Sequence, residues 1–152
     1  MWRISRRRGA LGAAAGTVIV LALAGCGGGS GDYPVEVTGQ MVDCNNDLAM
    51  AFTCQEDASD DRVSGESQVD FTCTTAGAVT TCTSDVVLTN DGGTWEGTVE
   101  GTATEEGDEG ALFHEFDAEM LGTGDYDGLR YTAHWEGYDW PWELTGTIDE
   151  VG

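Results

Sequence analysis

The stretch 94–103 (TWEGTVEGTA) decides the fold, because polar residues alternate with apolar or small ones all the way through it. Every second residue is Thr or Glu, and the residues between them are Trp95, Gly97, Val99, Gly101 and Ala103. Successive side chains of a β-strand point to opposite faces of a sheet, so this period predicts a strand with one buried and one solvated face. Helical periodicity is hard to find from residue 33 onward. The stretch therefore predicts an all-β domain.

The same alternation continues on both sides of this stretch. In 129–136, for example, Leu129, Tyr131, Ala133 and Trp135 share one face. The predicted strands lie near 35–43, 48–55, 66–74, 79–89, 94–103, 111–121, 128–137 and 141–149. Their connections are short, so neighbours should pair antiparallel. We predict one β domain at 35–152, an up-and-down barrel whose closure removes exposed strand edges, with a two-sheet sandwich as the alternative.

Charge limits the classes of partner. The 152 residues include 28 Asp or Glu and six Arg but no Lys, which gives a formal net charge of -22. Nucleic acid and anionic lipid head groups need clustered Lys or Arg, so neither is an expected partner. The acid-rich segments 55–62 and 104–110 are predicted to be solvated loops. The acidic surface suits an exported protein that resists aggregation, or one that attracts cations or a basic partner.

The first 25 residues have the layout of a secretory signal peptide, with four Arg before the apolar run 10–24. The run ends in Leu23-Ala24-Gly25-Cys26, which resembles the lipobox of bacterial lipoproteins. The resemblance implies cleavage after Gly25, a lipid on Cys26, and a protein anchored by that lipid alone at the outer face of the cytoplasmic membrane. Residues 26–34 would form a Gly-rich tether. A plain secretory signal followed by a chance cysteine is the alternative.

Four cysteines follow Cys26, and an even number in an oxidising compartment predicts two disulfides. A tight turn at Gly77-Ala78 would place Cys73 directly opposite Cys82 on the apolar face of a hairpin. The pairing of Cys44 with Cys54 rests on their spacing. The alternative joins Cys54 to Cys73 and Cys44 to Cys82.

The motifs 61–65 (DRVSG), 88–98 (LTNDGGTWEGT), 122–129 (GTGDYDGL) and 146–148 (GTI) follow one another along the predicted domain. Together they resemble a family of uncharacterised exported proteins from high-GC Gram-positive bacteria. The motif 122–129 is also similar to repeats in eight-stranded barrels of the allene oxide cyclase and dirigent type. Both resemblances imply an architecture, and the first implies no particular activity.

The alternation points a set of bulky side chains into the barrel, where they either fill it or line a cavity for a small apolar ligand. His114 is the one titratable residue that we place inside, as a core residue or as a base whose pKa burial would lower. His134 should face outward beside Glu136. The candidate cavity residues are Trp95, His114, Phe116, Tyr131, Trp135 and Trp142, with Met120 also pointing inward.

Two weaker candidate sites lie in turns. Tyr138 and Trp140 are expected in or beside the last turn, where exposed rings near carboxylates would suit a sugar. Carboxylates could also offer ligands to calcium, although neither candidate group has EF-hand spacing. Those groups are Asp125 with Asp127, and Asp57 with Asp60 and Asp61.

No catalytic motif is present, and no metal site or cofactor is expected, with calcium at the carboxylates above as the alternative. The sequence thus favours a cell-envelope lipoprotein that binds a small ligand or presents an interaction surface. The alternative is a barrel-type enzyme, such as a cyclase or isomerase, that uses an internal His114 with Tyr131.

Overall fold

The computed structural model describes residues 32–48, 51–106 and 110–152. The predicted signal peptide, Cys26 and the tether up to residue 31 lie outside the described residues. Within the described ranges no helix has the length and apolar character needed to cross a membrane. The strands are β1 (Val35–Leu48), β2 (Ala51–Ala58), β3 (Gly65–Asp70), β4 (Thr72–Ala76), β5 (Val79–Asn90), β6 (Gly93–Glu106), β7 (Ala111–Gly122), β8 (Leu129–Gly137) and β9 (Trp142–Glu150).

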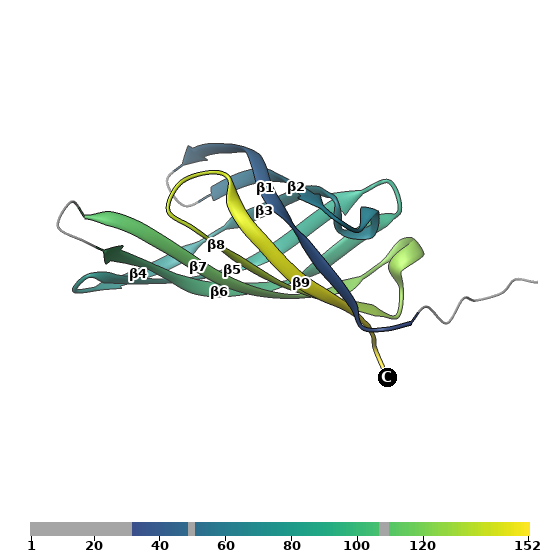
Figure 1. The fold of residues 1–152 in the computed structure, drawn as a ribbon. Coiled ribbons are helices and arrows are strands. Elements are labelled where there is room, and N and C mark those ends of the chain that lie inside the picture. Colours follow the sequence, from purple (N-terminus) through teal and green to yellow (C-terminus); the bar gives the residue numbers. More distant parts are fainter. Residues whose placement is uncertain (1–31, 49–50, 107–109) are drawn as a thin grey trace, which may run out of the picture.

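These strands close into an antiparallel barrel, which confirms the predicted architecture in place of the sandwich (Figure 1). Consecutive strands pair from β4 to β9, β9 pairs with β1, and β1 continues through β2 to β3. A further pairing of β3 with β5 closes the ring. The extra strand, β4, continues the line of β3 beyond Phe71 and keeps the same register against β5. The barrel therefore has eight strands around its circumference, with β3 and β4 together occupying one position.

Inward-facing side chains fill most of the barrel, as the alternation predicts. Large apolar residues such as Leu88 and Leu144 have at most 1% of their surface exposed. Removing this apolar surface from water is the main favourable term in folding. Of the seven bulky positions predicted to point inward, His114 is half-buried and the others are buried. The buried ones are Trp95, Phe116, Met120, Tyr131, Trp135 and Trp142.

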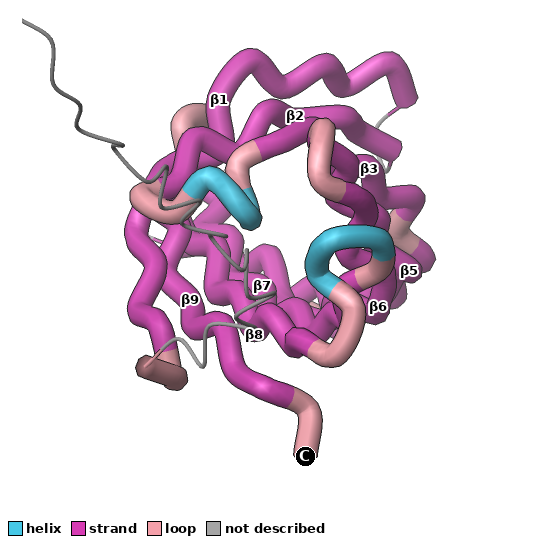
Figure 2. Tube along the Cα trace, turned by 90° about the vertical axis from the view of Figure 1, so that its right-hand side faces the viewer, coloured by secondary structure: helices cyan, strands magenta, loops and turns pink. Residues whose placement is uncertain are grey.

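The two ends of the barrel carry different elements. The closed end, nearest the viewer in Figure 2, carries the 3-10 turns η1 (Asp61–Val63) and η2 (Gly124–Tyr126), the start of β1 and the end of β9. Val63 of η1 is fully buried there. The open end carries the β4–β5 turn at Gly77-Ala78 and the β8–β9 turn at residues 138–141. All longer strands run between these two ends.

The prediction that 55–62 and 104–110 are solvated loops is wrong for most of their described residues. Residues 55–58 belong to β2, and residues 61–63 form η1. Residues 104–106 continue β6, while 107–109 lie outside the described residues. Acidic side chains on the outer face of a strand are solvated as well as those of a loop, so a run of charge does not mark the end of a strand.

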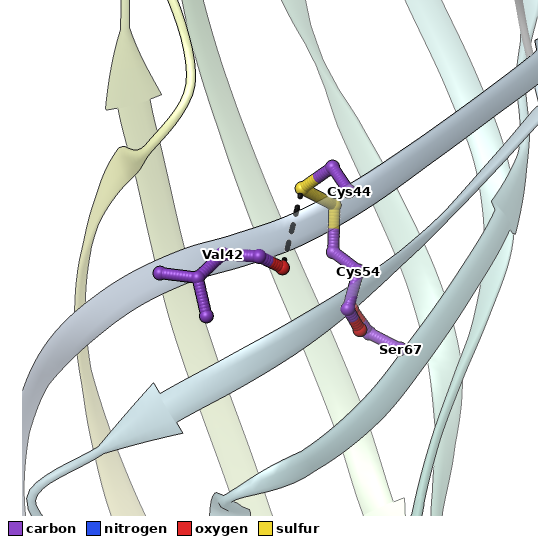
Figure 3. Close-up of a disulfide and its surroundings, with 4 residues drawn as sticks. All are labelled: Val42, Cys44, Cys54 and Ser67. Carbon is purple, nitrogen blue, oxygen red and sulfur yellow. Dashed lines mark hydrogen bonds between the residues drawn. A yellow bond between two sulfur atoms is a disulfide. The ribbon is translucent and has the colours of Figure 1, made fainter.

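Both predicted disulfides are present. Cys73 faces Cys82 across the β4–β5 hairpin, which is the pairing that the turn at Gly77-Ala78 predicts. Cys44 is joined to Cys54, which links β1 to β2 near the open end (Figure 3). The alternative pairing between these two hairpins is excluded.

A β-bulge explains how Cys44 reaches its partner. The residues Asp43 and Cys44 of β1 together oppose Cys54 of β2, and Asp43 adopts a left-handed φ of 49°. An extra residue in one strand reverses the faces of the residues that follow it. Cys44 therefore packs against the core with Met41, although strict alternation would place it on the outer face.

Candidate functional site

A cavity of about 410 Å³ opens at the open end of the barrel. Its size lies within the range of small-molecule sites, which are mostly concave and apolar. Six aromatic side chains dominate its lining, and both cysteines of the Cys73–Cys82 disulfide are part of its wall. The six are Phe52, Phe71, Phe116, Tyr138, Trp140 and Trp142.

Five of the six rings pack against one another, whereas Tyr138 packs against Phe113 outside the lining. Trp142, at the start of β9, stacks on Trp140 with 3.9 Å between ring centroids. Phe116 of β7 stacks on Phe71, at the junction of β3 and β4, with centroids 4.8 Å apart. Gly137 makes room for this arrangement, because a methyl group there would lie 2.7 Å from Cδ1 of Trp142. The wall is thus a connected set of rings.

His114 lines the same cavity. Its imidazole stacks on Trp142 with 4.7 Å between centroids. Burial lowers the pKa of His114, and the nearby carboxylate of Asp139 opposes this effect only in part. The ring is therefore neutral at neutral pH, and it presents both a donor and an acceptor nitrogen.

The rim of the cavity is exposed and acidic. The side chains of Tyr138 and Trp140 are 50% and 37% exposed, as expected for residues of the last turn. The phenol of Tyr138 donates a hydrogen bond of 2.6 Å to Glu106, which raises the pKa of Tyr138. Asp139 lies between the two rings in sequence and also lines the cavity. The rim therefore presents a tryptophan and a tyrosine to solvent beside carboxylates.

The predicted cavity residues divide into two groups. His114, Phe116 and Trp142 line the cavity. Trp95, Tyr131 and Trp135 lie deeper, with no exposed surface, and fill the barrel. The structure therefore does not bring His114 and Tyr131 together in one cavity, which is the arrangement that the enzyme alternative invokes.

A buried carboxyl group inside the barrel was not predicted. Glu56 of β2 has no exposed surface, and its two carboxyl oxygens have no hydrogen-bond partner within 3.5 Å among the described residues. Burial raises the pKa of Glu56 from 4.5 to about 8, against a smaller lowering by the hydroxyl of Ser67. The carboxyl group is therefore protonated at neutral pH. Alternation could have revealed it, because Glu56 has the same parity as the inward-facing Phe52 and Cys54.

Three other buried polar atoms have no hydrogen-bond partner among the described residues, namely Nε of Arg130, the hydroxyl of Tyr131 and Nε1 of Trp135; the last two belong to side chains that fill the barrel. Burial raises the pKa of Tyr131, and the nearby Glu56 raises it further. Buried polar groups without partners are rare in proteins and usually have a structural or functional reason. The atoms of Tyr131 and Trp135 belong to side chains without exposed surface that lie deeper in the barrel than the cavity lining.

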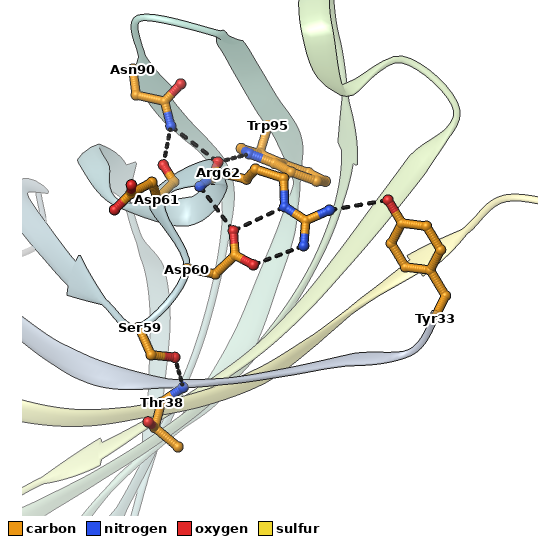
Figure 4. Close-up of polar contacts among 8 residues, drawn as sticks. All are labelled: Tyr33, Thr38, Ser59, Asp60, Asp61, Arg62, Asn90 and Trp95. Carbon is orange, nitrogen blue, oxygen red and sulfur yellow. Dashed lines mark hydrogen bonds and ion pairs between the residues drawn. The ribbon is translucent and has the colours of Figure 1, made fainter. Parts of the chain in front are cut away.

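The closed end is sealed by a network centred on Arg62 (Figure 4). The guanidinium donates to both carboxylate oxygens of Asp60, at 2.9 and 2.7 Å, and to the hydroxyl of Tyr33 at 3.0 Å. The Arg62 carbonyl accepts hydrogen bonds from the indole of Trp95 at 2.7 Å and from the amide of Asn90 at 3.0 Å. Most of the polar groups shown in Figure 4 are thus satisfied by one another.

Three of the four sequence motifs meet at this end. Arg62 comes from the first, Asn90 and Trp95 from the second, and Tyr126 from the third. The hydroxyl of Tyr126 donates to Asn90 Oδ1 at 2.7 Å, and its ring stacks on Trp95. These motifs build the seal of the barrel.

The residues considered for calcium do not form a metal centre. Among the residues that the structure describes, no three His, Cys, Asp or Glu side chains are grouped as metal ligands would be. Asp60 is bound to Arg62, and Asp125 and Asp127 are exposed around η2.

On the outer wall, His134 contacts Asp117 at 2.8 Å and Glu136 at 3.7 Å. This outward position beside Glu136 is the one that the alternation predicts. The hydrogen bond with Asp117 is the main cause that raises the pKa of His134.

Fold and cavity together define the class of the molecule. It is an eight-stranded antiparallel β-barrel, with one interrupted strand, that is sealed at one end and has an aromatic cavity at the other. Comparison with family models, with curated proteins and with solved structures gives no match. The family resemblance of the sequence motifs stays a prediction.

Proposed function

We propose that this protein is a lipid-anchored binding protein of the cell envelope, and that its barrel holds a small, flat, largely apolar ligand in the cavity at the open end. The observation that carries the proposal is the aromatic lining of that cavity, with Trp140 and Tyr138 exposed at its rim. Large exposed rings around a concave apolar surface are typical of ligand sites.

The position of the first described residues supports an orientation of the barrel in which the open end faces away from the membrane. The chain enters β1 at the closed end, through Tyr33 and Val35. A lipid on Cys26 would therefore hold the closed end toward the membrane and leave the open end facing away from it. A ligand could then reach the cavity from the surroundings of the cell.

Ligand binding is tested with N-phenyl-1-naphthylamine, a flat neutral dye whose fluorescence rises in apolar surroundings. We expect saturable binding to the full-length protein. Thr75 lines the cavity from β4, so Thr75→Trp should fill it and abolish binding. Thr74, the exposed neighbour on the same strand, gives the matched control, and Thr74→Trp should leave binding unchanged. Equal binding by both variants would place the dye outside the cavity and refute the proposal.

The lipid anchor has a separate test. Cys26→Ser should move the protein from the membrane fraction to the soluble fraction, because the acyl chains provide the membrane affinity. A Cys26→Ser protein that stays with the membrane, while still folding and binding the dye, would contradict the anchor and leave the binding function intact.

A second candidate function, a barrel-type enzyme, is favoured by one observation. His114 lines the cavity as a neutral imidazole, which is the form that can act as a general base. In such an enzyme His114 would act beside Asp139, since Tyr131 lies outside the cavity lining. Turnover of a bound ligand that is lost in His114→Gln, with ligand affinity retained, would support the enzyme over the binding protein.

A further inference from the structure

The charge around the cavity narrows the class of ligand. Asp139 lines the cavity, and Glu106 is held at its rim by the hydroxyl of Tyr138. In the described part of the chain Asp139 takes part in no ion pair within 4.0 Å, so no cation neutralises its carboxylate at that distance.

Within residues 32–48, 51–106 and 110–152, no Lys or Arg lies at this end of the barrel. The sequence has no Lys, and Arg62 and Arg130 are its only Arg after residue 8. Arg62 belongs to the network at the closed end, and Arg130 lies 3.8 Å from Asp149 near the end of β9. His114 is the one basic group of the lining, and burial keeps its ring neutral at neutral pH. The cavity is therefore negative without internal compensation.

The aromatic wall adds to the same preference. The faces of indole, phenol and benzene rings carry partial negative charge and attract organic cations, most strongly where water is excluded. Trp140, Trp142 and Phe116 line the cavity as one connected set of rings. An apolar cavity walled by rings, with carboxylates only at its mouth, suits a ligand with a flat apolar body and a positive charge.

We propose that the cavity at the open end binds planar organic cations in preference to neutral or anionic molecules of the same shape. This inference rests on the proposed binding function and specifies its ligand class. The rings would contact the flat body of the ligand, and Asp139 would provide the paired charge. The cavity volume suits a fused ring system of about the size of naphthalene to acridine.

Three probes of one shape test the inference: N-methylacridinium, neutral acridine and acridine carboxylate. Their dissociation constants for the full-length protein are measured by quenching of tryptophan fluorescence at about pH 8, where acridine is neutral. We expect the cation to bind about tenfold more tightly than acridine, and the anion to bind most weakly. Thr75→Trp should abolish binding of all three probes, and Thr74→Trp should not.

The decisive variant is Asp139→Asn, compared with Asp127→Asn. Both remove one negative charge, but Asp127 is exposed beside η2 at the closed end. We expect Asp139→Asn to weaken binding of the cation far more than binding of acridine, and so to remove most of the preference, whereas Asp127→Asn should preserve the preference. This pair separates the local carboxylate from the overall negative charge of the protein.

The other outcomes divide the two proposals. Equal binding of cation and neutral probe, blocked by Thr75→Trp, would overturn the cation preference and keep the binding function. A preference that both Asp variants reduce equally, or that Asp139→Asn leaves intact, would also overturn it, because the attraction would then be general. Absence of binding by any probe, the neutral dye included, would overturn the binding function itself.

Discussion

The strands are held together by different interactions at the two ends of the barrel. At the closed end the polar groups of Asp60, Arg62, Asn90 and Trp95 satisfy one another, and a buried turn completes the seal. At the open end two disulfides hold the strands, and aromatic rings remain exposed around a cavity. Covalent links hold an end of a barrel together without filling it. Polar contacts and a buried turn therefore fill the closed end, whereas the open end is cross-linked and keeps a cavity, which is where the proposed function places the ligand.

The largest expected effect is a difference in stability loss between tryptophan substitutions at the two ends. Trp95 is fully buried at the closed end, so Trp95→Ala should lower the free energy of unfolding by about 3–5 kcal/mol. Trp140 is 37% exposed at the open end, and Trp140→Ala should cost less than about 1 kcal/mol. Urea unfolding of both variants checks this. Equal losses would show that the rings at the open end also belong to the core.

The next effect concerns the disulfide that forms part of the cavity wall. Replacing Cys73 and Cys82 by Ser should lower the free energy of unfolding by about 2–3 kcal/mol, the value for a short closed loop. Because both residues line the cavity, the folded variant should also bind the dye more weakly. Unchanged dye binding with the stability loss would sharpen the comparison, since the bridge would then serve stability alone. Unchanged stability would contradict the assigned role.

The pH dependence of stability tests the buried carboxyl group of Glu56. Its pKa is about 8 in the folded barrel and near 4.5 in the unfolded chain. Between these values the folded protein keeps a proton that the unfolded chain releases, so stability falls as pH rises. The contribution of the Glu56 proton to the free energy of unfolding is fully present below about pH 4.5. It is lost at about 1 kcal/mol per pH unit up to pH 8, and stability no longer changes with this group above that pH.

A neutral isostere removes this dependence. The free energy of unfolding of Glu56→Gln should increase relative to that of the wild type as pH rises from about 5 to 8. Urea unfolding across that range measures the difference. Glu66→Gln provides the control, because it makes the same substitution at an exposed residue of β3. Parallel pH profiles for wild type and Glu56→Gln would show that the carboxyl group is solvated and ionised.

The smallest effect compares the two histidines. The pKa of His114 is lowered by burial at the cavity, and the pKa of His134 is raised by its hydrogen bond with Asp117 on the outer wall. An NMR titration should show His114 losing its proton at lower pH than His134. Asp117→Asn should bring the pKa of His134 down and leave His114 unchanged. The reverse order of the two titrations would mean that His114 faces solvent or is paired with Asp139.

Much of the architecture follows from alternation alone. The period of two predicts the strands and the inward positions of Trp95 and Trp142, and the turn at Gly77-Ala78 predicts the bridge between Cys73 and Cys82. The bridge between Cys44 and Cys54 follows only from spacing, because the bulge at Asp43 reverses the faces of β1. A single extra residue in a strand leaves no clear mark in the sequence.

The site is harder to predict than the fold. Glu56 lies in a run of acids, so its charge suggests a solvated loop although its parity places it inside. The network at Arg62 joins residues such as Asn90 and Trp95 that are 28 and 33 positions away, and only the closed barrel brings them together. Alternation names the inward rings but does not tell which of them fill the barrel and which line the cavity.

Binding at the open end is tested most directly by NMR of the indole N–H groups during titration with N-phenyl-1-naphthylamine. Four tryptophans of the described barrel report on different depths. Trp140 and Trp142 line the cavity, Trp135 lies deeper, and Trp95 is hydrogen-bonded at the closed end. We predict saturable shifts of the Trp140 and Trp142 signals, with the Trp95 signal unchanged. Shifts centred on Trp95, or no saturable shift at the open end, would contradict the account.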